Sequence, residues 1–197
     1  ILPLPGGRLF AGEPKRGDVV VFMHPHWRRV MIKRVIALPG DTLEVRGERI
    51  LLNGAPISSQ FLKRLRYVQH GERTVTTALE YEETLDGESY LVHQITKGAP
   101  GDTTPVFVVP EGHLFFMGDN RDNSKDAREL SGHCPPGDDG RITRAGCDPF
   151  GSRENASVGF VPIDHLIGRA ETVLFTTKRC QRGDGLDCPP ARLWKGL

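Results

Sequence analysis

Hydrophobic residues in this chain occur in short runs separated by glycine, proline and aspartate. Such runs are too short for most helices but suit strands, and several alternate apolar with polar positions. Helical periodicity is largely confined to residues 61–68. We therefore expect an all-β fold of coiled antiparallel sheets that is partly barrel-like, with a second β domain inserted. The runs expected to form strands are residues 19–22, 30–38, 42–45, 50–52, 106–109, 114–117 and 170–175.

A dense polar turn follows the apolar run at residues 114–117. Aspartate and asparagine favour turns because their side chains bond nearby backbone amides. Charges of both signs alternate between residues 119 and 128, and pairing between them would lock the turn. Rigid polar loops at strand ends often carry functional sites. A solvated surface turn is the alternative interpretation.

The expected strand at residues 30–38 contains a lysine in an apolar setting. A period of two places Lys33 on the same face as Met31, Val35 and Ala37. Desolvation lowers the pKa of a lysine, and a base that works near neutral pH must lose about two to three units from a model value near 10.4. Lys33 is therefore a candidate base, with an edge-protecting or snorkelling lysine as the alternative.

Three segments together resemble the type I signal peptidases, which are membrane-tethered serine proteases that use a serine and lysine dyad. The segments are residues 16–22 (RGDVVVF), 32–41 (IKRVIALPGD) and 118–128 (GDNRDNSKDAR), in the order that this family has. The resemblance implies a β fold and a protease that removes signal peptides from secreted preproteins. It implies no metal and no other cofactor.

The resemblance assigns roles to two residues of these segments. Lys33 would be the general base, and Ser124 would hydrogen-bond and orient its amine. A neutral amine is an acceptor that needs a fixed direction, and a hydroxyl can donate to it without favouring the charged form as a carboxylate would.

Two ion pairs are implied as supports of this site. Asp126 would pair with Arg128, and Arg34 would pair with Asp119, which ties the polar turn to the strand that carries Lys33. The family commonly has serine where this chain has Ala127, so one hydroxyl contact would be missing.

The nucleophile of the family lies in a Ser-Met-x-Pro motif several tens of residues before the Arg-Gly-Asp segment. Residues 1–197 contain no such motif, have no serine before Ser58 and have no apolar run long enough to span a bilayer. We expect the serine and a membrane anchor to lie upstream, and residues 1–197 alone to be inactive. The alternatives are a nucleophile-free relative that binds signal peptides and a peptidase dedicated to one conjugation or pilus substrate.

The strand before Lys33 is a candidate peptide-binding edge. An extended substrate would add along Val30, Met31 and Ile32 through main-chain bonds, and its alternate side chains would enter pockets. Secretory signals end in small residues of the Ala-x-Ala type, so Val21, Met31 and Ile32 are candidate walls of shallow apolar pockets. Ordinary core positions are the alternative interpretation of these three residues.

Composition suits a folded module of 197 residues, and the net charge of +1 leaves no basic excess for nucleic acid. We expect no nucleic-acid partner. The expected catalytic β domain combines residues 1–41 and 105–177, with a further insertion at 131–157. Residues 42–104 are expected to form the inserted second domain, and residues 178–197 a disulfide-stapled tail.

Four cysteines lie in the last third of the chain, in segments with little hydrophobic periodicity. We expect disulfides between Cys134 and Cys147 and between Cys180 and Cys188, because each closes a short loop that cannot bury its own core. Such bonds fit an oxidising compartment, and the resemblance implies a bacterial inner membrane with the catalytic domain facing the periplasm.

Metal sites compete with these interpretations but are less well supported. Zinc at His133 and Cys134 lacks a Cys-x-x-Cys pair. Calcium at the polar turn would need glycine where Ala127 stands, and a final glutamate ligand that does not follow. His24 and His26 have no cysteine or carboxylate close by in the sequence, and we expect a plain loop there.

Overall fold

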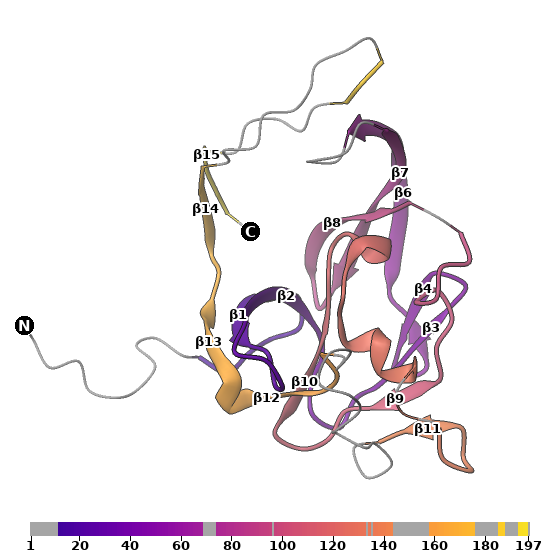
Figure 1. The fold of residues 1–197 in the computed structure, drawn as a ribbon, viewed down its shortest axis with the longest axis vertical. Helices are drawn as coiled ribbons and strands as arrows, with labels where there is room; N and C mark the ends of the chain where they lie inside the picture. The colour runs from indigo at the N-terminus through magenta and orange to yellow at the C-terminus, as the bar shows by residue number, and fades with distance from the viewer. Residues whose placement is uncertain are drawn as a thin grey trace, which may run out of the picture.

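The computed structural model describes residues 12–68, 74–95, 97–132, 134, 136–143, 158–175, 185–187 and 193–196. It consists mainly of antiparallel strands, which confirms the expected β-dominated fold (Figure 1). The sheets are open in the described part of the chain, and none of them closes into a barrel there. No helix among the described residues is long and apolar enough to cross a membrane.

The first sheet has the strand that carries Lys33 at its centre. Its order is β12-β10-β2-β1-β13. Val35 on β2 packs into one apolar cluster and Ile36 into another, so this end of the strand is buried on both faces. Every residue of β10 is buried as well, which explains its continuous apolar run. The strands are β1 (Val19–Met23), β2 (Val30–Ala37), β10 (His113–Met117), β12 (Val161–Pro162) and β13 (Leu166–Arg169).

The second sheet has the order β11-β9-β3-β4-β5 and is antiparallel except where β11 pairs with β9. A tight turn joins β4 to β5, with Asn53 and Gly54 at φ of 52° and 80°. Asn-Gly favours such left-handed turns. The strands are β3 (Thr42–Arg46), β4 (Arg49–Leu52), β5 (Ala55–Pro56), β9 (Val106–Val108) and β11 (Arg141–Ile142). The proposed division into domains stays a prediction.

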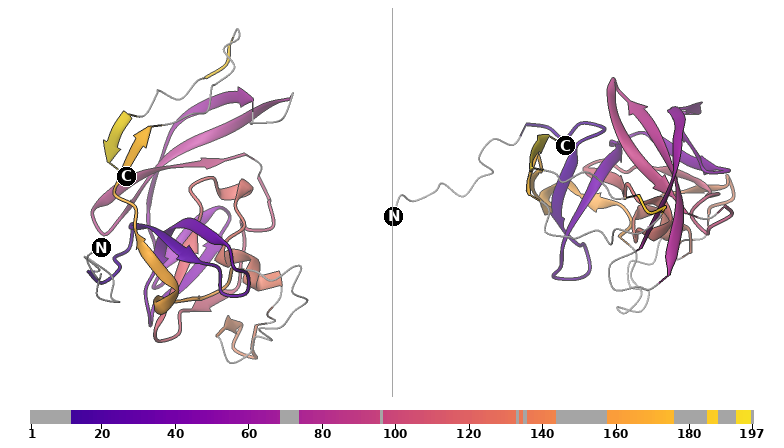
Figure 2. Two further views of the ribbon diagram at one scale, coloured as in Figure 1. Left: turned by 60° about the vertical axis from the view of Figure 1, so that its left-hand side comes forward. Right: turned by 90° about the horizontal axis from the view of Figure 1, so that it is seen from above.

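The third sheet is built on a long hairpin that extends away from the other strands (Figure 2). Its strands are β6 (Ser58–Val68), β7 (Val75–Leu85) and β8 (Glu88–Gln94). Residues 61–68, where the sequence has helical periodicity, lie in β6 and pair with β7. The helical pattern does not decide their conformation, because cross-strand pairing outweighs a weak local pattern. A separate pair joins β14 (Thr172–Phe175) to β15 (Leu193–Gly196).

Three short 3₁₀ helices complete the described structure. Two follow β10 directly and form the polar turn, η1 (Arg121–Asn123) and η2 (Ala127–Gly132). The third, η4 (Ile163–His165), leads into β13. The polar turn thus starts where the buried β10 ends, next to β2 in the same sheet.

Candidate active site

Lys33 and Ser124 lie side by side although 91 positions separate them in the chain. Lys33 Nζ is 2.6 Å from Ser124 Oγ, within hydrogen-bond distance. Lys33 projects from β2, and Ser124 directly follows η1 in the polar turn. The pairing of β10 with β2 brings the two segments together, since β10 runs directly into the turn.

The surroundings of Lys33 lower the pKa of its amine below the usual value. Burial is the largest cause, because a low-dielectric setting disfavours the ammonium. The charge of Arg128 lowers the pKa further, while the carboxylates of Asp126, Glu129 and Asp119 raise it. Since burial dominates, the amine gives up its proton more readily than a solvated lysine does.

Asp126 organises the turn from inside. Its fully buried carboxylate accepts a 3.0 Å bond from the Gly118 amide and two 2.9 Å bonds from the Arg128 guanidinium. Arg128 Nη2 also donates to the backbone oxygen of Arg121. The predicted contact between Asp126 and Arg128 is therefore present, and it closes the turn around Ser124.

Gly118 lies against the pair at a very short distance. A Cβ built on Gly118 would lie 2.1 Å from Ser124 Oγ and 3.3 Å from Lys33 Nζ. Real Cβ atoms do not approach other atoms at 2.1 Å, so only glycine leaves room for the serine hydroxyl in this position.

Arg34 ties the polar turn to β2, as the resemblance implied. Its Nε and Nη2 donate to the two carboxylate oxygens of Asp119 at 2.8 and 2.7 Å. Its Nη1 donates to the Gly17 carbonyl at 2.7 Å. A two-pronged bond of this kind fixes direction as well as distance. Arg34, the neighbour of Lys33 in the chain, is thus held against Asp119, the neighbour of Gly118.

Two residues of the third sheet reach the same region, and sequence reasoning missed both. Glu83 on β7 binds Arg121 through two bonds of 2.6 and 2.5 Å, and both side chains are almost fully buried. The ring of Tyr90 on β8 lies 4.1 Å from the Arg34 guanidinium carbon. Glutamates in a polar strand look solvated in a sequence, so no local signal marks Glu83.

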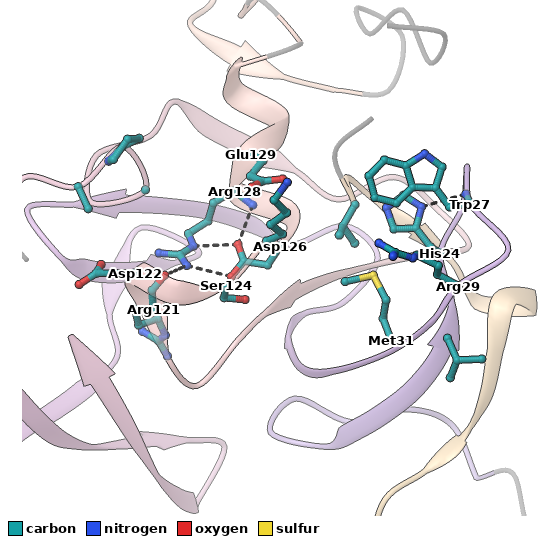
Figure 3. Close-up of a pocket in the computed structure, with 16 residues that line it drawn as sticks. His24, Trp27, Arg29, Met31, Arg121, Asp122, Ser124, Asp126, Arg128 and Glu129 are labelled. Carbon is teal, nitrogen blue, oxygen red and sulfur yellow. Dashed lines mark hydrogen bonds and ion pairs between the residues drawn. The ribbon is translucent and has the colours of Figure 1, made fainter. Parts of the chain in front are cut away.

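A cavity of about 890 Å³ opens beside Ser124 (Figure 3). The polar turn forms one wall with Ser124, Asp126 and Glu129, and the start of β2 and the loop before it form the other. Of the four residues expected to bind substrate, Val30 and Met31 line this cavity. Val21 and Ile32 are not among its lining residues.

One edge of β2 is uncovered next to this cavity in the described part of the chain. β1 pairs with Val30 through Arg34, whereas β10 pairs only with Arg34, Val35 and Ala37. The Val35 amide and carbonyl bond to the segment before β1. Because main-chain groups alternate sides along a strand, those of Val30 and Ile32 point to the uncovered edge.

His24 is buried in the loop that lines the cavity, as an acceptor in a local network. Its Nδ1 accepts the amides of His26 and Trp27 at 3.1 and 3.2 Å, and its ring stacks on Trp27 at 4.6 Å. Burial, followed by the charges of His26 and Arg29, lowers the pKa of His24 to about 4. The loop between β1 and β2 is therefore packed around a neutral imidazole.

The expected disulfides stay predictions. Cys134 is buried, but Cys147, Cys180 and Cys188 lie outside the described residues, as do His133, residues 144–157 of the expected insertion and most of the expected tail.

Comparison with known proteins gives a family match over most of the chain. The family model described as "Signal peptidase, peptidase S26" matches residues 8–175. Signal peptidase I of Rickettsia typhi (strain ATCC VR-144 / Wilmington) is 35% identical over 185 residues, which cover 90% of this chain. Signal peptidase I of Rickettsia canadensis (strain McKiel) is 34% identical over a stretch of the same length. The match spans 58% of the length of each of these two relatives.

Comparison with solved structures also gives matches to this chain, and one of them is a signal peptidase I. The crystal structure of a signal peptidase I from Enterococcus faecalis V583 is 22% identical, with a TM-score of 0.41. The similarity covers 81% of this chain and 97% of that chain.

Proposed function

Because this chain belongs to the signal peptidase (peptidase S26) family, we propose that it is the catalytic part of an enzyme that removes signal peptides from secreted preproteins with a Ser-Lys dyad. The observation that carries the proposal is the 2.6 Å distance between a half-buried lysine amine and the Ser124 hydroxyl. Burial destabilises a charged lysine but favours the neutral amine, which is the form that acts as a base.

In this mechanism the neutral amine of Lys33 takes the proton of a serine hydroxyl supplied from outside residues 1–197. The serine oxygen attacks the scissile carbonyl, the leaving amine takes up the proton from Lys33, and an acyl-enzyme forms. Lys33 then accepts a proton from water as the water oxygen attacks the ester, and it returns this proton to the serine oxygen as the new acid is released, which restores both the serine hydroxyl and the neutral amine. Ser124 keeps the amine pointed along this path.

The uncovered edge of β2 is the proposed substrate site. An extended peptide would bond to the main-chain groups of Val30 and Ile32, which places its scissile bond near Lys33. Small side chains at the cleavage site would face the wall near Met31, with Val21 and Ile32 as neighbouring strand residues. The site would work at the outer face of a bacterial inner membrane, held there by an upstream anchor.

The proposal is tested with Lys33→Met in the full-length protein, since methionine fits an apolar strand face. We expect cleavage of preproteins to fall by about 10²–10⁴-fold or more without unfolding, because the base is lost. Lys15→Met is the matched control, since Lys15 is exposed and lies outside the site. Wild-type cleavage by Lys33→Met would rule out the dyad.

Ser124→Ala should slow the reaction less than Lys33→Met does, because the hydroxyl orients the base and makes no bond to substrate. A wild-type rate would mean that another group positions the amine. Cleavage of several unrelated preproteins by the same full-length protein would show general processing, and cleavage of a single one would show a dedicated peptidase.

A further inference from the structure

The ion pair between Glu83 and Arg121 is one of the two most deeply buried in the described part of the chain, together with that between Asp126 and Arg128. The side chains of Glu83 and Arg121 are 4% and 3% exposed. Removing two charges from water costs about as much as their attraction returns, so such a pair adds little to stability compared with apolar side chains of the same size. The role of this ion pair must therefore include the positions in which it holds the two side chains and their strands.

This positioning concerns the turn with Ser124. Arg121 is the first residue of η1 and lies three positions before Ser124. Glu83 holds its guanidinium through two bonds, while its carbonyl accepts a bond from Arg128. Main-chain contacts act in the same direction, since the His93 amide donates to the Asp119 carbonyl at 2.8 Å. The turn is thus fastened to β7 and β8 as well as to β10.

Lys33, the other member of the catalytic pair, is supported from the same two strands, β7 and β8. Glu83 and Tyr90 are direct cross-strand partners in the β7–β8 ladder. The Tyr90 ring lies under the guanidinium of Arg34, whose chain neighbour is Lys33. One cross-strand pair therefore reaches both segments, Glu83 through Arg121 and Tyr90 through Arg34.

We propose that Glu83 and Tyr90, on the β7–β8 hairpin, are positioning residues for the reaction. They hold Lys33 Nζ and Ser124 Oγ at a separation of 2.6 Å. This inference rests on the proposed function. It gives the third sheet a role in catalysis that does not involve contact with the substrate. Displacements of about 1 Å at a catalytic group can cost about 10²-fold in rate, so loss of this support is measurable.

The test is Glu83→Gln in the full-length protein, with cleavage followed against pH. We expect kcat to fall by about 10–100-fold and KM to stay within about twofold, because the lost contact holds the catalytic pair and not the substrate. The acidic limb of the kcat profile should also move to higher pH, since a displaced Ser124 lets water reach the Lys33 amine.

Glu82→Gln is the matched control, because Glu82 is the next residue on β7 and points to the opposite face of the sheet. Equal kcat and equal pH limbs in the two variants would overturn the inference. A loss of kcat that only matches a loss of folded protein, with an unmoved limb, would also overturn it.

Glu83→Asp covers the case in which Glu83→Gln fails to fold. It keeps the charge and shortens the side chain by one methylene, so we expect a smaller loss of kcat and a limb displaced in the same direction. An unmoved limb in a folded Glu83→Asp with reduced kcat would count against positioning. Activity in Lys33→Met would instead remove the proposed function itself, so the two failures are distinguishable.

Discussion

Gly118 is the residue at which the smallest change should have the largest effect. An alanine methyl there would overlap Ser124 Oγ, at 2.1 Å, and lie 2.6 Å from Ser124 Cβ. We expect Gly118→Ala to lower kcat/KM by about 10²-fold, because Ser124 must move away from Lys33. Gly168→Ala is the control, since nothing lies within 4 Å of a Cβ at Gly168. Equal kcat/KM in the two variants would contradict the tight packing.

A second residue-scale prediction concerns His24 and acid stability. The pKa of His24 is lowered from 6.5 to about 4, chiefly by burial. Between these pH values the unfolded chain binds a proton that the folded protein does not, so the free energy of unfolding falls as pH decreases from 6.5 to 4. The stabilising contribution of the neutral His24 is fully present above pH 6.5. We expect this group to contribute about 1–3 kcal/mol of that loss.

Urea unfolding at pH 7, 5 and 4 measures the effect in His24→Gln against wild type. Carboxylates titrate in both proteins, so the relevant quantity is the difference between them. The variant should be less stable at pH 7, and the gap should narrow towards pH 4. A gap that stays constant with pH would show that His24 titrates normally.

At the scale of elements, the uncovered half of β2 predicts a main-chain contribution to substrate binding. Ile32→Pro removes the amide at the uncovered edge, and the side chain of Ile32 is 55% exposed, so little packing is lost. We expect KM to rise by about tenfold, the worth of about one hydrogen bond.

Ile32→Ala separates the side chain from the main chain, because it keeps the amide. Steady-state cleavage of a peptide substrate measures both variants. A KM that rises equally in the two would assign the effect to the Ile32 side chain and argue against strand addition.

Local pattern predicted the strands with clear apolar runs, β1 to β4, β9, β10 and β14, because alternation and turn chemistry are short-range signals. The turn at Asn53 and Gly54 is the clearest example, with both residues at positive φ. Local pattern did not predict β6, β7 and β8 of the third sheet. The strand at residues 61–68 could not be predicted, because their periodicity is weak and pairing with β7 decides their conformation. Pairing with a partner several residues away along the chain is not visible in the segment itself.

At the scale of the whole molecule, the resemblance to the family, and not any local pattern, anticipated which residues meet within and between the matched segments. The contacts of Lys33 with Ser124 and of Arg34 with Asp119 are of this kind. Glu83 and Tyr90 were missed because their place depends on the register of β7 with β8 and on how this sheet docks against the polar turn. That arrangement is a property of the assembled fold.

The uncovered edge of β2 also affects how the protein behaves in solution. Val30 and Ile32 are 61% and 55% exposed, and their main-chain groups at this edge pair with no strand among the described residues. This edge is therefore a template for any extended chain, including that of another molecule. We expect the isolated domain to self-associate as its concentration rises. Short peptides that mimic a strand should keep it monomeric in sedimentation experiments. The backbone of such a peptide is also a starting point for inhibitors.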